Sequence, residues 1–270
     1  MPTDGPGGED RSGTLPAMAG APPEAAGDGP RTLVVIPAFN EQDALPKTLA
    51  HLRATVPELD VVVVDDGSAD DTAAVAIAAG VVCLQLPFNL GIGGALRTGF
   101  RYAVEMGYER ALQFDADGQH DAGQIHLLLD ELDRGADMVV GSRFAGEGDY
   151  RVGRSRGLAM RILRWAIRRL AGRRFSDTSS GFRAFGPEVL RSFASEYPIE
   201  YMDSVEALVL ACRAGFDVRE VPVVMHERIA GQASNRRFRL AYHYVRVLVV
   251  LATSKRVRGP SGDRPRVVAT

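Results

Sequence analysis

A short apolar run and two carboxylates meet in the segment Leu112-Gln113-Phe114-Asp115-Ala116-Asp117-Gly118-Gln119-His120-Asp121. The pattern predicts a buried strand that ends in Asp115 and Asp117, and residues two apart along a strand point to the same side. Gln119 follows one alternation later and offers a carbonyl oxygen. Such hard oxygen ligands suit Mg²⁺ or Mn²⁺ on a diphosphate. Asp and Gly are also common in plain turns, so the segment alone leaves both interpretations open.

Apolar runs alternate with helical patterns on both sides of this segment. Strands are predicted at residues 32–37, 59–64, 81–86 and 137–140, with helices at about 42–54, 70–79, 95–106 and 124–133. This strand–helix repeat predicts one α/β domain with a doubly wound, mostly parallel sheet. Ligands of such sheets bind at the carboxyl ends of the strands. Each predicted strand is followed there by a polar cluster, so we expect the site at that edge.

The glycines of Asn89-Leu90-Gly91-Ile92-Gly93-Gly94 are not a dinucleotide-binding fingerprint. Leu96 stands where the third glycine of that motif belongs, and the loop follows the third strand of the chain and not the first. A backbone that approaches a ligand closely is the better interpretation. Three interpretations stay open for Asp65-Asp66-Gly67-Ser68: a receiver-type acidic pocket, a nucleotide-contacting turn or a capped loop. His120 is interpreted as a turn residue.

Composition limits the other possibilities. The net charge is −2, and the two cysteines, Cys83 and Cys212, lie in apolar segments, which predicts buried thiols in a reducing compartment. Arginine carries almost all the positive charge and can bind a phosphate through two parallel hydrogen bonds. Residues 1–30 are rich in Gly, Pro and Ala, so we expect a disordered tail that lacks the features of a secretory signal.

The segment 143–174 holds ten arginines and only two acidic residues. Leu158, Ile162, Trp165 and Leu170 recur within it at helical spacing. The pattern predicts a basic amphipathic helix, which lies either on an anionic membrane surface or with its apolar stripe on the sheet. No aromatic platform accompanies the charge, so we expect no nucleic-acid partner. The longest apolar run of the expected closing helix, 247–253, is too short to span a bilayer.

The rest of the chain continues the α/β pattern. The polar turn 176–181 leads into a short strand, a helix is expected at 205–214, a strand at 217–225 and a last helix around 240–251. We therefore divide the chain into the disordered tail 1–30, a folded domain 31–235, and a C-terminal helix with a basic tail, 236–270.

Taken in order and spacing, these clusters resemble the family 2 glycosyltransferases with the GT-A fold, and within them the dolichol- and polyprenyl-phosphate mannose and glucose synthases. The resemblance covers about residues 32–235. It rests on Pro37-Ala38-Phe39-Asn40-Glu41, on 64–72, on Asn89-Leu90-Gly91 with Gly94-Ala95, on 115–120, on Gly141-Ser142-Arg143 and on Ser180-Gly181-Phe182-Arg183. One departure is that the family's Arg-x-x-Gly-x-Ser-Lys pattern lacks its lysine after Arg228, where Arg236 or Arg237 is the candidate substitute.

The resemblance implies an inverting, metal-dependent enzyme that moves a hexose from a nucleotide-sugar, GDP-mannose or a UDP-hexose, to polyprenyl or dolichyl phosphate. It implies that Asp115, Asp117 and Gln119 are catalytic and hold Mg²⁺ or Mn²⁺. Nucleotide-binding residues would be Pro37, Ala38, Asn40, Glu41, Asp65, Asp66, Gly91 and Ala116. Acceptor-phosphate residues would be Arg143, Arg154, Ser180, Arg183 and Arg228. It further implies a cytoplasmic enzyme, peripheral on the cytoplasmic membrane face, with a membrane-protein partner as a further option.

Two other functions compete with this one. The first keeps the fold but transfers the sugar to a hydroxyl of a soluble glycoside or polysaccharide, which requires a general base, whereas a phosphate is already anionic near neutral pH. The arginine-rich segment and the Ser180–Arg183 loop favour the phosphate. The second is a non-catalytic relative that binds a membrane protein, and the intact Asp115, Asp117 and Gln119 argue against it. A nucleotidyltransferase would need a glycine- and lysine-rich N-terminal loop, which is absent.

Overall fold

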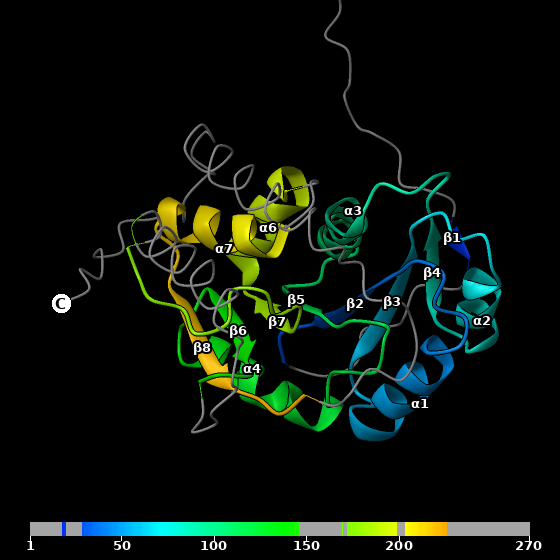
Figure 1. The fold of residues 1–270 in the computed structure, drawn as a ribbon, viewed down its shortest axis with the longest axis horizontal. Helices are drawn as coiled ribbons and strands as arrows, with labels where there is room; N and C mark the ends of the chain where they lie inside the picture. Colours follow the sequence, from blue (N-terminus) through cyan, green and yellow to red (C-terminus); the bar gives the residue numbers. More distant parts are fainter. Residues whose placement is uncertain (1–17, 20–28, 146–168, 170–171, 199–202, 226–270) are drawn as a thin grey trace, which may run out of the picture.

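One mixed sheet forms the centre of the molecule. The computed structural model describes residues 18–19, 29–145, 169, 172–198 and 203–225 of the 270-residue chain. Within them, eight strands lie in the order β1-β4-β3-β2-β5-β7-β6-β8 (Figure 1). Their bounds are β1 Met18–Ala19, β2 Thr32–Ala38, β3 Asp60–Asp65, β4 Val82–Gln85, β5 Arg110–Gln113, β6 Met138–Ser142, β7 Arg183–Phe185 and β8 Val218–Pro222.

The sheet is mostly parallel, as the sequence predicts. β4, β3, β2 and β5 are parallel neighbours, and β6 is parallel to β8. β7 runs antiparallel between β5 and β6, and β1 runs antiparallel on the edge of β4. Because the strands that precede the polar clusters run in one direction, those clusters emerge at the same edge.

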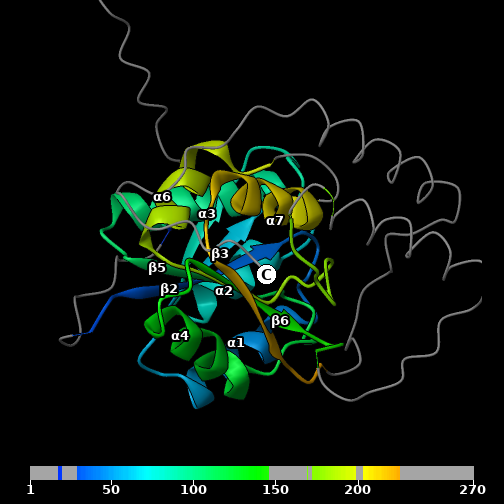
Figure 2. The same cartoon turned by 90° about the vertical axis from the view of Figure 1, so that its left-hand side faces the viewer.

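Helices cover both faces of the sheet (Figures 1 and 2). One face carries α3 Ile92–Glu105, α6 Pro187–Glu196 and α7 Asp203–Ala214; the other carries α1 Leu45–Thr55, α2 Thr72–Ala78 and α4 Ile125–Asp133, with the short η1 Ala122–Gln124 before α4. A separate hydrophobic core lies on each face of the sheet, and successive residues of β2 point alternately into one and the other. Val35 packs toward α3, and Val34 packs toward α1. This double burial explains the continuous apolar run of β2.

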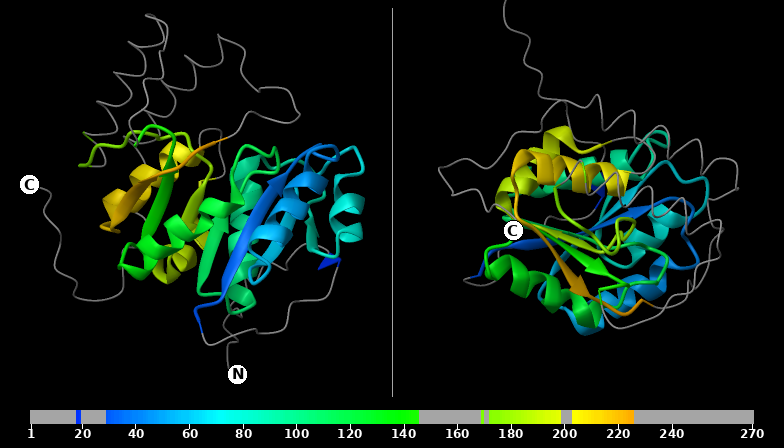
Figure 3. Two further views of the ribbon diagram at one scale, coloured as in Figure 1. Left: turned by 90° about the horizontal axis from the view of Figure 1, so that it is seen from below. Right: turned by 60° about the vertical axis from the view of Figure 1, so that its left-hand side comes forward.

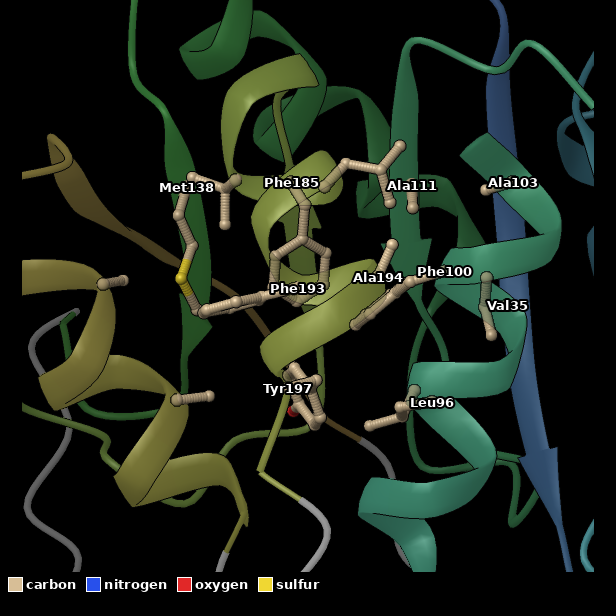
Figure 4. Close-up of a cluster of buried hydrophobic side chains, with 14 of the residues drawn as sticks. Val35, Leu96, Phe100, Ala103, Ala111, Met138, Phe185, Phe193, Ala194 and Tyr197 are labelled. Carbon is tan, nitrogen blue, oxygen red and sulfur yellow. The ribbon is translucent and has the colours of Figure 1, made fainter. Parts of the chain in front are cut away.

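Aromatic rings fill the core beneath α3 and α6 (Figure 4). Phe100 of α3 meets Phe185 of β7 and Tyr197 edge-on, with ring centroids 4.9 and 5.2 Å apart. Phe193 of α6 completes the cluster, 5.9 Å from Phe185. Edge-to-face contacts of this kind add to the stabilisation that burial of the rings provides. The cluster therefore fixes β7, whose preceding loop reaches the carboxyl edge of the sheet.

The structure confirms a buried thiol for Cys83 and places Cys212 at a partly buried position. Both are free thiols. Burial raises the pKa of Cys83 to about 11 and that of Cys212 to about 12. Thiols with such pKa values are poor nucleophiles at neutral pH.

The structure departs from the predicted elements in three places. The short strand expected after the polar turn is present as β7, but its antiparallel direction and the helix α6 are not indicated by the sequence. β7 has three residues, too few for a periodic pattern, and its place is set by its two neighbours. Met18–Ala19, within the predicted disordered tail, pair with Leu84 and Cys83 at the open edge of β4, so the prediction does not hold for these two residues.

Other predicted elements fall outside the described residues. They are most of the basic amphipathic helix, the last helix around 240–251, and the rest of the N-terminal tail apart from residues 29 and 30. Arg173, at the end of the basic segment, is described and donates from Nη1 to Asp217 Oδ1 at 2.8 Å. In the ranges that the structure describes, no helix is both long and apolar enough to cross a bilayer.

Candidate active site

The polar clusters lie at the carboxyl edge of the sheet, as predicted. Figure 3 shows the central strands running side by side toward this edge. The loops after β2, β3 and β4 bind one another, and the turn after β5 meets the loop before β7. These two groups of loops form the two halves of the site.

Asn40 joins the loops after β2 and β3. Its backbone N–H donates to Ser68 Oγ at 2.9 Å, and its Oδ1 accepts from the N–H of Ala69 at 2.9 Å. Asn40 has a φ of 55°, a left-handed conformation that Asn tolerates better than most residues. The N–H of the next residue, Glu41, donates to Thr72 Oγ1 at 2.9 Å. The predicted nucleotide-binding residues after Pro37 and Ala38 are therefore on a loop that is fixed before any ligand binds.

Asp66 fastens the loop after β4 to the end of β3. Its two carboxylate oxygens accept from the N–H groups of Leu90 at 2.7 Å and Gly91 at 2.9 Å. Burial raises the pKa of Asp66, and the two backbone hydrogen bonds offset part of that rise. The structure thus gives Asp66 a supporting role that the sequence did not indicate, and its contact with a nucleotide stays a prediction. Asp65 is also buried and accepts from the N–H of Ser68 at 3.1 Å.

The strand β5 ends at Gln113, so the prediction that Asp115 and Asp117 alternate along a strand is wrong. β7 pairs with β5 only as far as Arg183, opposite Gln113. The two aspartates lie in the turn that follows. Asp117 is 5% exposed and its Oδ1 accepts from the N–H of Gln119 at 3.0 Å, which closes the turn.

The carboxylate of Asp115 is enclosed by two neighbours. His120 Nε2 is 3.1 Å from Asp115 Oδ2, and the His120 side chain is 3% exposed. Gly181 also lies against this carboxylate, since a Cβ added to it would come 2.4 Å from Oδ2. Extending the Gln113–Arg183 pairing by two residues places Gly181 opposite Asp115. Sequence reasoning missed His120 and Gly181, although both lie within quoted motifs.

The turn that carries the aspartates is anchored to α1. The carbonyl oxygen of Ala116 accepts from Thr48 Oγ1 at 2.9 Å. Ala116 itself is buried, and Gln119 is partly exposed. The anchor holds the turn against the body of the domain.

The turn has the chemistry of a partial metal site. Among the residues that the structure describes, no three His, Cys, Asp or Glu side chains come together in a way that holds a metal. Asp115, Asp117 and the Gln119 amide are hard oxygen ligands, and the absence of a side chain at Gly181 leaves just enough room for the Asp115 carboxylate. Such a set fits Mg²⁺ or Mn²⁺ that takes its other ligands from water and a bound phosphate.

Arg143, predicted to bind the acceptor phosphate, is held by Asp177. Its Nε donates to Oδ2 at 2.7 Å and its Nη2 to Oδ1 at 2.9 Å, and Nη2 also donates to Ser179 Oγ at 2.9 Å. The Asp177 side chain is 1% exposed and that of Arg143 36%. Burial alone would raise the pKa of Asp177, but the hydrogen bonds and charge of Arg143 outweigh it and lower that pKa. Sequence reasoning did not single out Asp177, which stands in the polar turn before β7.

Arg183, predicted to bind the acceptor phosphate, is fully buried in the structure. Its Nε donates to the carbonyl oxygen of Ser180 at 2.8 Å, so it supports the 178–181 loop from within. Its Nη1 and both amide atoms of the facing Gln113 are buried without a hydrogen-bond partner in the described part of the chain. Ser180 is buried and accepts from the N–H of Phe182 at 3.2 Å. Arg154 and Arg228 lie outside the described residues.

We expect Asp177→Asn to destabilise the protein at neutral pH and to have little effect in acid. The pKa of Asp177 is lowered in the folded state, so its ionised form contributes stability above its unfolded-state pKa of about 4, and this is lost as the pH falls through the folded-state pKa. Urea unfolding should show a difference of about 1–3 kcal/mol at pH 7, typical of a charged hydrogen bond. The difference should narrow below about pH 4; a constant difference down to pH 3 would contradict the role of this ion pair.

Solved structures place this fold among the GT-A glycosyltransferases. The glucosyl-3-phosphoglycerate synthase of Mycobacterium tuberculosis matches with a TM-score of 0.63 at 21% identity, over 87% of this chain and 83% of that one. The same enzyme with Mg²⁺ and uridine diphosphate matches with a TM-score of 0.62 at 24% identity, over 87% and 82%. At this identity the likeness confirms the predicted fold and nothing finer.

The sequence comparisons identify the family. The model of the family described as "Glycosyl transferase family 2" matches residues 33–196. The polyprenol monophosphomannose synthase of Mycolicibacterium smegmatis is 32% identical over 222 residues, 79% of this chain and 84% of the relative. The undecaprenyl-phosphate mannosyltransferase of Micrococcus luteus is 35% identical over 215 residues, 75% and 86%. The chain belongs to glycosyl transferase family 2 and is a glycosyltransferase, as its motifs predict.

Proposed function

We propose that this enzyme transfers a hexose from a nucleotide-sugar to polyprenyl phosphate and inverts the anomeric configuration. The observation that carries the proposal is the Asp115–Asp117 turn at the carboxyl edge, beside the interlocked loops after β2, β3 and β4. The two relatives described above act on polyprenol or undecaprenyl phosphate by name and are mannose enzymes, so mannose from GDP-mannose is the first donor to test. A relative from Methanococcus voltae, 27% identical over 213 residues, is named for UDP-N-acetylglucosamine and dolichyl phosphate, so UDP-sugars belong in the same test.

The nucleotide is proposed to bind between the ends of β2, β3 and β4. Pro37, Ala38, Asn40, Glu41 and Asp65 line one side, and Gly91 and Ala116 complete the pocket. Because Asn40 and Asp66 already tie these loops together, little conformational entropy is lost when the nucleotide binds. Asp66 acts in this scheme by holding the Gly91 loop.

Asp115 and Asp117, with the amide oxygen of Gln119, are the residues proposed to hold Mg²⁺ or Mn²⁺. A divalent cation at this place offsets the charge that develops on the leaving diphosphate. The similar fold of glucosyl-3-phosphoglycerate synthase has been solved with Mn²⁺ and UDP-glucose, which supports the use of a divalent cation by this enzyme. The chain itself contributes a fixed turn, since Ala116 is bound by Thr48 and Asp117 by the N–H of Gln119.

Arg143 and the loop before β7 are proposed to face the acceptor phosphate. A phosphate oxygen attacks the anomeric carbon from the face opposite the diphosphate; the new carbon–oxygen bond forms as the bond to the nucleoside diphosphate breaks. Because the phosphate is already ionised, no side chain has to remove a proton. Arg143, oriented by Asp177 and partly exposed, screens the repulsion between the two anionic substrates. Ser180 and Arg183 shape this loop from within, and Arg154 and Arg228 stay predicted contacts.

Since the acceptor is a lipid, we place the enzyme on the cytoplasmic face of the membrane.

A nucleotide screen by thermal unfolding tests the donor side of this proposal. GDP, UDP and their mannose, glucose and N-acetylglucosamine conjugates are compared with Mn²⁺ and with EDTA. A ligand at 100 times its Kd stabilises the fold by about 2.7 kcal/mol, which corresponds to a rise in Tm of about 5–10 °C for a domain of this size. We expect such a rise for one nucleotide, in Mn²⁺ only. No rise with any nucleotide would contradict the proposed donor site.

A further inference from the structure

We infer that His120 is a positioning residue whose imidazole holds the carboxylate of Asp115 in the orientation that binds the divalent cation. The inference rests on the proposed function, because it concerns the cation site at Asp115 and Asp117. His120 Nε2 and Asp115 Oδ2 are 3.1 Å apart. Because the partner atom belongs to a carboxylate, we assign the proton to Nε2, which donates it to Oδ2.

The imidazole ring has one fixed orientation. It stacks on the ring of Phe182, with centroids 5.0 Å apart and an angle of 19° between the planes. The ring of Phe114 meets its edge, with centroids 5.3 Å apart at 73°. The backbone of His120 pairs with Met225 in an isolated antiparallel bridge. A ring held on two sides and at its backbone directs Nε2 at one place only, so the carboxylate that accepts from it is fixed as well.

The two rings that pack on His120 belong to sequence neighbours of Asp115 and Gly181. Phe114 immediately precedes Asp115, and Phe182 immediately follows Gly181, whose backbone lies against the same carboxylate. The imidazole thus binds Oδ2 of Asp115, while the backbone of Gly181 lies close to the same carboxylate and limits its movement. A carboxylate confined in this way presents its remaining lone pairs in a constant direction, which is the requirement of a preorganised metal ligand.

The need to fill space in the protein interior does not explain why position 120 holds a histidine. Its side chain is 3% exposed, and its Nδ1 is buried without a hydrogen-bond partner among the described residues. A buried polar atom without a partner is unfavourable, and an apolar side chain of similar size would avoid it. The hydrogen bond from Nε2 to Asp115 is therefore the property that distinguishes histidine from an apolar residue at this position.

Two variants separate the hydrogen bond from the ring packing. His120→Gln places an amide nitrogen where Nε2 stands but lacks the ring, and His120→Phe keeps a ring on Phe182 but has no donor. The readout is Mn²⁺ binding, followed by the electron paramagnetic resonance of free Mn²⁺ with saturating GDP or UDP and no acceptor. Loss of a residue that orients a metal ligand costs about 10–100-fold in metal affinity. We expect a loss in this range for His120→Phe at an unchanged Tm, and most of the wild-type affinity for His120→Gln.

Asp117→Asn distinguishes a failure of this inference from a failure of the proposed function. If His120→Phe binds Mn²⁺ as the wild type does while Asp117→Asn has lost binding, the inference is overturned and the cation site stands. If His120→Gln loses as much affinity as His120→Phe, the hydrogen bond is not the cause and the inference is also overturned. If Asp117→Asn retains wild-type affinity, the proposed cation site itself is wrong. Should His120→Phe fail to fold, His120→Leu serves as the variant without a donor.

Discussion

Asp117→Asn is expected to abolish metal-dependent sugar transfer and to leave the fold intact. The substitution removes the negative charge but keeps Oδ1, which accepts from the N–H of Gln119 at 3.0 Å and closes the turn. Without that charge, Asp115 is the only charged residue of the proposed ligand set, and several kcal/mol of charge stabilisation at the leaving group are lost. We expect kcat/KM to fall about 1000-fold, since every 1.4 kcal/mol is a factor of ten. Initial rates of labelled-sugar transfer over a range of Mn²⁺ concentrations measure the effect.

Asp121→Asn is the matched control. Asp121 belongs to the same segment, but it accepts from the N–H of Gly123 at 2.9 Å at the start of η1 and is not among the proposed ligands. Hydrogen bonds to Gly123 and Gln124 outweigh burial and lower its pKa, which indicates a structural carboxylate. The control variant should keep its transferase activity. Full metal-dependent activity in Asp117→Asn would show that this carboxylate does not hold the cation.

Gly181→Ala is expected to reduce transfer strongly through Asp115. The new Cβ would lie 2.4 Å from Oδ2 and 2.8 Å from Oδ1, closer than any normal contact, so the carboxylate has to move. A displacement of about 1 Å at a catalytic group can cost about 100-fold in rate. Gly181 is not in the left-handed region, so the effect acts on the carboxylate and not through backbone strain. We expect a higher KM for Mn²⁺ together with a lower kcat.

Gly123→Ala provides the comparison for this variant. Its Cβ would also approach an aspartate carboxylate, that of Asp121, but at 3.2 Å, a contact that a small shift relieves. Both variants add one methyl group beside an acidic side chain, and only one of those side chains belongs to the proposed site. If Gly181→Ala and Gly123→Ala had equal and small effects on the Mn²⁺ dependence, the close packing of Gly181 on Asp115 would have no role in the reaction.

The central strands are predictable because each is buried on both faces. The runs ending at Pro37 and Val64 contain little but apolar residues, and they correspond to β2 and β3 within one residue at either end. Glycines and polar clusters mark the ends, so the carboxyl edge is predictable as the site. The family follows from the same clusters, and the comparisons confirm it.

The finer structure of the site depends on partners distant in sequence. Whether the chain is still a strand at Asp115 is decided by β7, which contributes only three residues and enters the sheet antiparallel. The sequence predicts that Arg143 binds the acceptor phosphate. In the structure the guanidinium of Arg143 is bound by Asp177, which lies 34 residues later in the chain. The sequence indicates only a turn residue at His120, and the structure places the rings of Phe114 and Phe182 against its imidazole. Such pairings leave no local pattern in the sequence.

The identity of the acceptor is the central claim, and one transfer experiment tests it most directly. The wild-type enzyme is given the labelled nucleotide-sugar selected by the thermal screen, Mn²⁺ at pH 7, and either polyprenyl phosphate or the polyprenol of the same chain length. The two lipids differ only in the phosphate that Arg143 is proposed to face. We predict labelled lipid with the phosphate and none with the alcohol. Transfer to the polyprenol or to a soluble glycoside, with none to polyprenyl phosphate, would contradict the account.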